Sequence, residues 1–152
     1  MSTQHFLYLS SDDSLNYFPG NSHSDFYVKM LNSSIFNDVS LCGIIGFQFY
    51  DSVLVNNNPV TNNTQLNMYV CSDICQQSFV NDSMYPVLTR LSVKVNNDST
   101  LKEIEIQNPI YIPIVQYFNQ NIHLYIKGDE DSRISLLKGP TKVTLHLKSQ
   151  DC

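Results

Sequence analysis

The stretch VLTRLSVKV, residues 87–95, decides the fold class because its side chains alternate along the chain. One face would carry Val87, Thr89, Leu91, Val93 and Val95, and the other Leu88, Arg90, Ser92 and Lys94. A two-residue period is that of a β-strand, whose successive side chains point to opposite faces of a sheet. We therefore expect a half-buried strand here, with one face toward the core.

Two further segments repeat this period. In KVTLHLK, residues 142–148, and NIHLYIK, residues 121–127, every second residue is valine, leucine or isoleucine. The residues expected to face the core are Val143, Leu145, Leu147, Ile122, Leu124 and Ile126. His146 and His123 then fall on the outward faces, where a solvated or hydrogen-bonded imidazole is commoner than a catalytic one.

The longest apolar segment is VSLCGIIGFQFYDS, residues 39–52. Strict alternation places on one face Val39, Leu41, Ile45, Phe47 and Phe49, and on the other Cys42, Ile44, Gln48 and Tyr50. Both faces are too apolar for an exposed edge, so we expect neighbouring segments to cover them. Gly43 and Gly46 suggest a β-bulge or a close backbone approach, because glycine weakens a flat strand.

Shorter candidate strands are residues 5–9, 26–31, 66–71, 101–106 and 110–114, and Pro113 should keep the last of these at an edge or a bend. Eight or nine strands separated by turn signals, in a chain of 152 residues, predict one all-β domain over residues 1–152, a sandwich or a barrel. Residues 72–80 alone suggest at most a short helical turn, because Ser72 suits an N-cap and Asp73 a first turn.

Charge and composition exclude several function classes. The net charge is −5, and the lysines are scattered singly, so no basic patch is available to follow a phosphate backbone and direct nucleic-acid binding is not expected. The first residues have no positive leader followed by an apolar core, and no run approaches the ~18 apolar residues of a membrane span. We expect a soluble protein that is made in the cytosol.

The reactive side chains form no recognisable site. Cysteines occur at positions 42, 71, 75 and 152, and a chain of this kind has little need of disulfides, so we expect free thiols. No spacing supplies the roughly four ligands of a zinc site, no GxSxG turn is present, and no glycine-rich phosphate loop occurs. Glu103 and Glu105 suit the solvent side of a strand, and residues 128–131 a solvated hairpin tip. The sequence predicts no catalytic residue, no cofactor and no metal.

Four segments carry a resemblance to a known family. They are SLNYFPGNSHSDFYVKML (14–31), LCGIIGFQFYDS (41–52), MYVCSDICQQSFVNDSMYPVL (68–88) and YIPIVQYFNQNIHLYIKGDEDSRISLLKGPTKVTLHLK (111–148). Their order along the chain resembles that of the penton, or minor capsid, proteins of polinton (Maverick) elements and adintoviruses. The chain departs from that family in having no tryptophan before its Cys-Gly strand, and Leu147 where a phenylalanine often stands.

The resemblance implies a fold and a function. It implies a single jelly roll, a β-sandwich of two antiparallel sheets with about eight strands, that assembles as a homopentamer at the vertices of an icosahedral virion beside a major capsid protein of double jelly-roll type. It also implies that Ser72, Asp73 and Ile74 form a structural corner between sheets or toward a neighbouring subunit. Phe79, in the same segment, is a candidate subunit contact.

Two other functions stay open from the residues alone. One is a carbohydrate- or ligand-binding β-sandwich module that uses asparagines and tyrosines of the loops. The other is a small β-sandwich hydrolase, which would need clustered carboxylates, or a histidine with a nucleophile. The residues to examine for the hydrolase are Asp73, Glu103, Glu105, His123 and His146.

Overall fold

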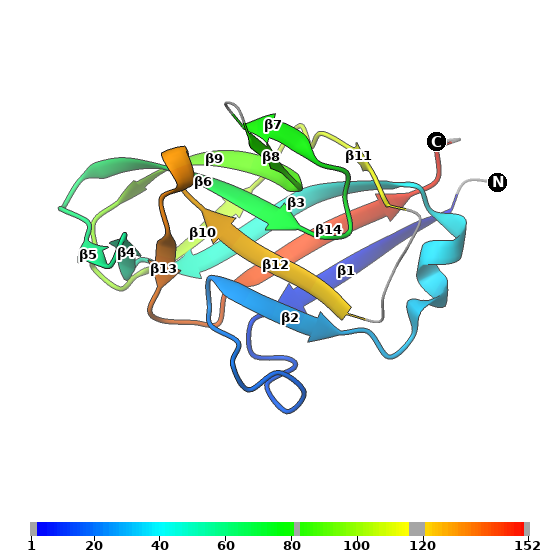
Figure 1. Ribbon diagram of the computed structural model, residues 1–152, viewed down its shortest axis with the longest axis horizontal. Coiled ribbons are helices and arrows are strands. Elements are labelled where there is room, and N and C mark those ends of the chain that lie inside the picture. The colour runs from blue at the N-terminus through cyan, green and yellow to red at the C-terminus, as the bar shows by residue number, and fades with distance from the viewer. Residues whose placement is uncertain (1–2, 81–82, 116–120, 151–152) are drawn as a thin grey trace.

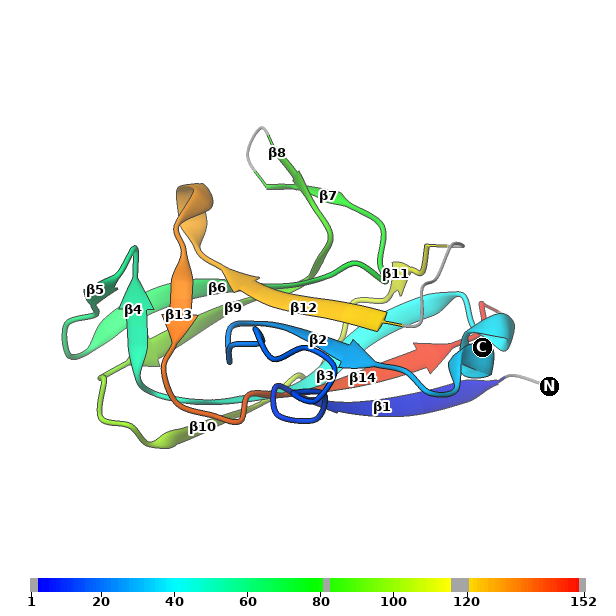
Figure 2. The same cartoon turned by 60° about the horizontal axis from the view of Figure 1, so that its bottom comes forward.

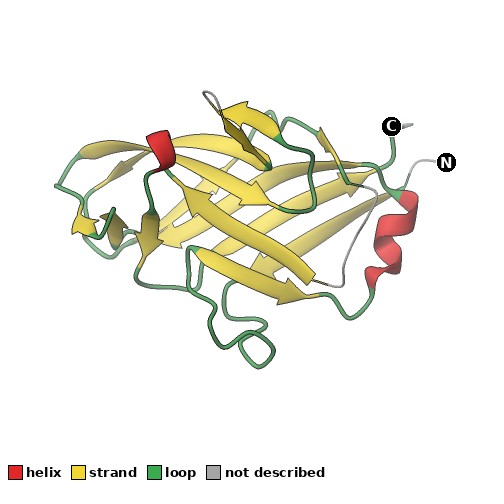
Figure 3. Ribbon diagram, viewed as in Figure 1, coloured by secondary structure: helices red, strands yellow, loops and turns green. Residues whose placement is uncertain are grey.

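The computed structural model describes residues 3–80, 83–115 and 121–150, and it is an all-β sandwich (Figures 1 and 3). Each of its two principal sheets has four long antiparallel strands. Sheet A has the order β1 (Gln4–Ser10), β14 (Lys142–Lys148), β3 (Leu41–Tyr50) and β10 (Leu101–Glu105). Sheet B has the order β2 (Asp25–Lys29), β12 (Asn121–Lys127), β6 (Thr64–Ser72) and β9 (Val87–Val95). The prediction of an all-β sandwich is confirmed.

Shorter elements surround the two sheets. The strands are β4 (Val53–Val55), β5 (Asn58–Pro59), β7 (Ser78–Val80), β8 (Ser83–Tyr85), β11 (Ile112–Pro113) and β13 (Ile134–Leu136), and the 3-10 helices are η1 (Ser33–Asp38) and η2 (Asp129–Asp131). Each of the nine predicted strands matches an element. β11 pairs with one end of β3 and lies outside the four-strand order of sheet A. Five short strands were not predicted, because two or three residues carry too little periodic signal.

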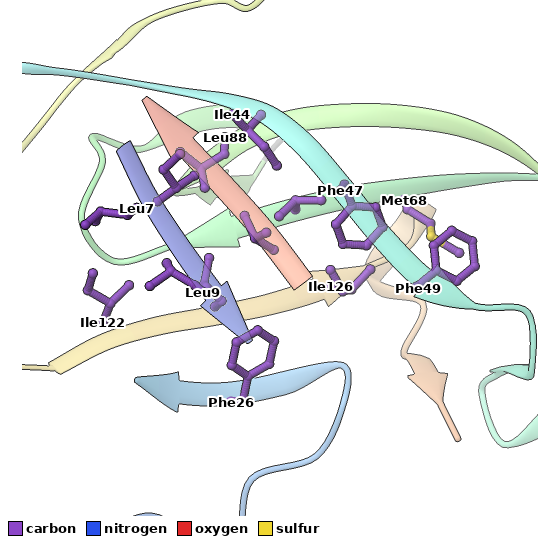
Figure 4. Packing of buried hydrophobic residues seen from close by; sticks show 14 of the residues in the cluster. Leu7, Leu9, Phe26, Ile44, Phe47, Phe49, Met68, Leu88, Ile122 and Ile126 are labelled. Carbon is purple, nitrogen blue, oxygen red and sulfur yellow. The ribbon is translucent and has the colours of Figure 1, made fainter. Parts of the chain in front are cut away.

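The core lies between the two sheets and is built from their inward-facing side chains (Figure 4). The alternation predicted for β14 and β12 is confirmed, because all six of their predicted inward residues are buried. The largest fully buried side chains are Phe26, Phe49, Ile44, Met68, Ile74, Ile122, Leu124, Ile134, Leu145 and Leu147. These residues come from both sheets, from the β6 corner and, for Ile134, from β13, so one hydrophobic core serves the whole sandwich.

Bulges change the phase of two strands, and strict alternation was wrong there. In β3, Thr144 faces Gly46 and Leu145 faces Ile44, which leaves Ile45 without a partner of its own. The buried residues are therefore Cys42 and Ile44 before the bulge, and Phe47 and Phe49 after it. An extra residue in one strand of a pair reverses the inward and outward sets beyond it.

A second bulge lies at the start of β9, opposite the end of β6. Val70 of β6 faces Thr89 and Cys71 faces Val87, so Leu88 is the extra residue. Leu88 was predicted to point outward with Arg90, but it is buried in the core. Val93 and Val95, beyond the bulge, face the core as predicted.

Gly43 makes the close approach that its position in the strand suggested. A Cβ atom there would lie 2.9 Å from Cε1 of Tyr111, inside van der Waals contact. Gly46 is different, because a Cβ atom there would lie 3.5 Å from the Thr144 side chain, which is ordinary contact. The two glycines of β3 therefore have different roles, one sterically required and one beside the bulge.

The expected helical turn at residues 72–80 is absent. Residues 73 and 74 form a turn, and residues 78–80 are the strand β7. The Ser72 hydroxyl does accept a hydrogen bond from the Ile74 backbone N–H, at 3.4 Å, but the chain then leaves the helical region to pair with β8. Ser72 thus closes a tight turn instead of capping a helix.

Candidate functional site: the β6 corner and the β7–β8 hairpin

The corner after β6 joins three neighbouring segments. The Ser72 N–H donates to the Pro86 carbonyl at 2.9 Å, the Gln76 N–H donates to the Pro113 carbonyl at 3.0 Å, and the Val115 N–H donates to the Ile74 carbonyl at 2.9 Å. Ser72 and Ile74 are fully buried. The corner therefore ties the end of sheet B to the β11 segment of sheet A.

Asp73 connects the corner to β12. Its Oδ1 atom accepts a hydrogen bond from the His123 backbone N–H at 3.0 Å, and its own N–H donates to the His123 carbonyl at 3.3 Å. Burial raises the pKa of the Asp73 carboxyl above its usual value, and the hydrogen bond from His123 opposes that rise. The carboxylate thus continues the backbone pairing of β12 beyond the end of β6, at a cost in desolvation.

His123 lies on the outward face of sheet B, as predicted, within a row of rings. Its ring stacks on Tyr27 with centroids 4.2 Å apart, and its Nε2 atom is 2.6 Å from Oδ1 of Asp25. The Tyr125 ring also lies next to it, with ring centroids 5.0 Å apart. These ring contacts make the row a cross-strand structural ladder.

Cys42, Cys71 and Cys75 are buried free thiols, as predicted, and Cys152 lies outside the described residues. Burial raises the pKa of Cys71 to about 11 and that of Cys75 to about 12, and it raises the pKa of Cys42 further. Thiols in this state react slowly, since the thiolate is the nucleophile. Within the described residues, no group of three histidine, cysteine or carboxylate side chains is placed to hold a metal ion.

The β7–β8 hairpin follows the corner and is a two-stranded sheet of its own. Figure 2 shows it standing away from sheet B. Phe79 of β7 faces Met84 of β8 in the register, so both side chains project from one face of the ribbon. Phe79 is 72% exposed and Met84 is 50% exposed. This face of the hairpin therefore displays an apolar pair to solvent.

The other face of the hairpin is anchored to sheet B through Lys127. The Lys127 ammonium lies 4.2 Å from the ring centroid of Tyr85 and 4.9 Å from that of Tyr69, and it donates to the Gly128 carbonyl at 3.0 Å. The Tyr85 hydroxyl donates to a carboxylate oxygen of Asp131. A buried lysine between two ring faces is a favourable cation–π arrangement. Tyr85 thus fixes the hairpin while Phe79 stays outward.

The acidic turn at residues 128–131, predicted as a solvated hairpin tip, also supports this anchor. Asp129 accepts hydrogen bonds from Asn67 and from the Tyr69 hydroxyl, each at 2.9 Å. The hydrogen bond from Asn67 is the main cause of a lowered pKa of the Asp129 carboxyl. Asp129, Glu130 and Asp131 are exposed, as expected, but the turn also organises the outer side of sheet B.

A groove of about 810 Å³ crosses the outer face of sheet A. Glu103 and Glu105 line it, together with Asp12 and Asp13 from the loop after β1. Among the described residues, Lys142 is the only cationic side chain in its lining. Tyr8 of β1 also lines the groove and is 76% exposed. The two glutamates face solvent, as predicted, and they share the groove with two further carboxylates that the sequence did not connect to them.

The residues to examine for a hydrolase do not gather into one site. Asp73 contacts His123 of sheet B, but the Asp73 carboxylate accepts its hydrogen bond from the His123 backbone N–H. Glu103 and Glu105 belong to sheet A. His146, on the same sheet, has its two ring nitrogens at 2.6 Å from the Tyr111 hydroxyl and 2.8 Å from Oε1 of Gln4. The arrangement of these five side chains offers no nucleophile beside a base.

Sequence reasoning singled out Phe79 but missed its partner Met84 and the anchor Tyr85. A usable signal was present, because SFV and SMY are short apolar-containing runs that only two residues separate, as in a tight hairpin. Lys127 was predicted only as the end of a strand. Its burial depends on Tyr85, which is remote in sequence, so no local pattern could reveal it.

Neither protein-family models nor curated proteins match this chain. In the described part of the chain, no helix is long and apolar enough to cross a membrane.

Proposed function

We propose that this chain is a viral structural protein, a penton or minor capsid protein of the polinton and adintovirus type that forms homopentamers at icosahedral capsid vertices. In this function, the sandwich is a single jelly roll in a virion, made in the host cytosol, and its neighbour is a major capsid protein of double jelly-roll type. Its action would be geometric and not chemical, since the protein would close a fivefold ring.

The pairing of the eight long strands is the observation that carries the proposal. In chain order, the first pairs with the last (β1 with β14), the second with the seventh (β2 with β12), the third with the sixth (β3 with β10), and the fourth with the fifth (β6 with β9). This is one long antiparallel hairpin folded over into two sheets, which is how a jelly roll is built. Jelly rolls are frequent in viral capsids, although fold alone does not assign function.

A ring of five copies sets requirements on the surface. Its subunits meet head to tail, so one face of each copy contacts a different face of the next. Stable interfaces of this kind bury roughly 800 Å² on each partner, about a tenth of the surface of a small protein. The described chain has 8474 Å² of accessible surface, which leaves room for two such faces. The exposed Phe79 and Met84 are suited to the apolar centre of one of them.

Native mass spectrometry of the purified protein over a concentration series tests the proposal. A discrete five-subunit species supports it. If the protein stays monomeric, it should be co-expressed with a double jelly-roll major capsid protein and the assemblies isolated. Absence of this chain from the vertices of those assemblies refutes the vertex function.

The groove on sheet A favours a second candidate, a carbohydrate-binding module. Sugars are bound by an exposed aromatic ring together with carboxylate and amide groups, and Tyr8, Gln48 and Glu103 all line the groove. Saturable binding of a glycan by the monomer, lost in Tyr8→Ala and kept in Tyr17→Ala, supports this function. A glycan array without signal at high protein concentration refutes it.

A further inference from the structure

The hairpin patch, Phe79 and Met84, is an apolar pair that the subunit itself does not cover. A two-stranded hairpin is marginally stable alone, but this one is held from its other face by Tyr85. The apolar pair is therefore not needed to hold the hairpin against sheet B. Edge ribbons are usually protected by charged side chains, yet the described hairpin residues, 78–80 and 83–85, include none. A projecting ribbon whose described residues are uncharged and carry an outward apolar pair is suited to contact another chain.

A second apolar surface lies at the β2 edge of sheet B. The loop between β1 and β2 closes the free edge of β2 with its own side chains. Asn21 exchanges two hydrogen bonds of 2.9 Å with the backbone of Tyr27, and the Lys29 N–H donates to the Ser14 hydroxyl at 2.9 Å. These bonds occupy the backbone of the edge strand, so β-strand addition is blocked there and contact has to be made through side chains.

The side chains displayed at that edge are large and apolar. We call Leu15, Tyr17, Tyr27 and Leu31 the loop patch. Tyr17 is 58% exposed and Leu31 is 83% exposed. The loop patch thus has the same character as the hairpin patch but a broader area, with a backbone held in place by the hydrogen bonds of Asn21 and Ser14.

The two patches lie on opposite sides of the subunit. In chain order the hairpin comes between β6 and β9, which pair at one side of sheet B, whereas β2 is the edge strand at the other side. Figure 1 shows the hairpin at the top of the molecule, and β2 with the loop before it at the bottom. Two different surfaces on opposite sides cannot meet within one symmetric dimer contact, but they can meet head to tail in a ring.

We propose that the hairpin patch of one copy docks on the loop patch of a second copy, which makes these patches the two halves of a head-to-tail subunit interface. This inference rests on the proposed function, because it names the contact that would close the ring. The six side chains expose on the order of 700 Å², if a large side chain has ~150–250 Å² in all. That is about half of the roughly 1,200–2,000 Å² of a standard interface, as expected for its apolar centre.

The test uses two variants of the full chain and a control. The hairpin variant is Phe79→Ser with Met84→Ser, and the loop variant is Tyr17→Ser with Leu31→Ser. Leu137→Ser is the control, because Leu137 is 55% exposed but belongs to neither patch. Urea unfolding midpoints close to that of the parent establish that each variant is folded.

Native mass spectrometry of each protein, and of the two variants mixed in equal amounts, gives the readout. We expect each variant alone to stay monomeric even at concentrations ~10-fold above those at which the parent assembles. The mixture should contain a 1:1 heterodimer, because the loop variant keeps an intact hairpin and the hairpin variant keeps an intact loop patch. The control should assemble like the parent.

The outcomes separate this inference from the proposed function. A parent pentamer that persists in both variants overturns the docking and leaves the vertex function standing. An assembly of another number, lost in each variant and restored as the heterodimer, supports the docking and counts against the pentamer. A parent that is monomeric at every concentration overturns the docking.

Discussion

Replacing Gly43 with alanine tests whether the close approach between β3 and Tyr111 is required by packing. The new Cβ atom would lie 2.9 Å from Cε1 and 3.0 Å from Cδ1 of Tyr111. The ring cannot retreat freely, because its hydroxyl is 2.6 Å from Nδ1 of His146 and the Lys148 ammonium lies 3.9 Å from its centroid. The substitution therefore has to displace a ring that is held at its edge and on its face.

The expected magnitude follows from two opposing effects. Overpacking a well-filled site costs roughly 1–3 kcal/mol, whereas alanine restricts the unfolded chain more than glycine and contributes ~0.4–1 kcal/mol to stability. Gly43→Ala should therefore lower the free energy of unfolding by about 1 kcal/mol or somewhat more. Gly46→Ala, the matched control in the same strand, meets only ordinary contact and should leave stability unchanged or raise it slightly.

Urea unfolding followed by circular dichroism measures both variants, with the midpoint and the slope fitted together. Tyr111→Ala provides the decisive comparison, because it removes the ring that Gly43→Ala would strike. In that background, Gly43→Ala should cost nothing further, and the difference is the coupling energy of the pair. If Gly43→Ala and Gly46→Ala give the same midpoint in the parent, the steric argument is wrong.

Three further predictions concern carboxylates and the hairpin. Asp51→Ala should lower stability by about 2–4 kcal/mol, because its buried carboxylate accepts backbone N–H groups at 2.8 and 3.1 Å that would lose their partner; an unchanged urea midpoint would contradict this. Asp73→Asn should raise the free energy of unfolding at pH 7 relative to the parent. The pKa of Asp73 is raised in the folded protein, so its ionised carboxylate opposes folding above that pKa. The advantage of the variant should therefore vanish as the pH falls through the folded pKa of Asp73. If Asp73→Asn instead lowers stability at pH 7 and the loss disappears in acid, the ionised carboxylate stabilises the fold and the prediction is wrong. Tyr85→Phe removes the hydroxyl that donates to Asp131, so amide hydrogen exchange should accelerate in the hairpin and stay unchanged in β14. Equal protection in both proteins would show that the hydrogen bond does not hold the hairpin.

The strands could be predicted because their signal is local. In β12 and β14, neighbouring residues alternate between core and solvent, and each predicted inward residue is buried. The bulges at Ile45 and Leu88 could not be placed from the same pattern, because an extra residue is defined only by the partner strand it fails to pair with. Gly43 and Gly46 did mark the right strand for a bulge and a close approach.

The corner could be predicted in part. Ser72, Asp73 and Ile74 do turn the chain at the end of β6, but they form a tight turn followed by a strand where a short helix was expected. Helical signals of one or two turns are weak, because a short helix gains too few hydrogen bonds to form without tertiary support. The pairing of β7 with β8 outweighed those signals.

The sequence by itself determined that this protein is an all-β domain with free thiols at Cys42, Cys71 and Cys75, since periodicity and composition are properties of neighbouring residues. Only the tertiary structure decided that Lys127 is buried between two rings and that Phe79 points away from the subunit. Both depend on Tyr85, whose hydroxyl bonds a residue 46 positions away. Contacts at such separations are set by how the sheets fold over one another, and no local pattern records them.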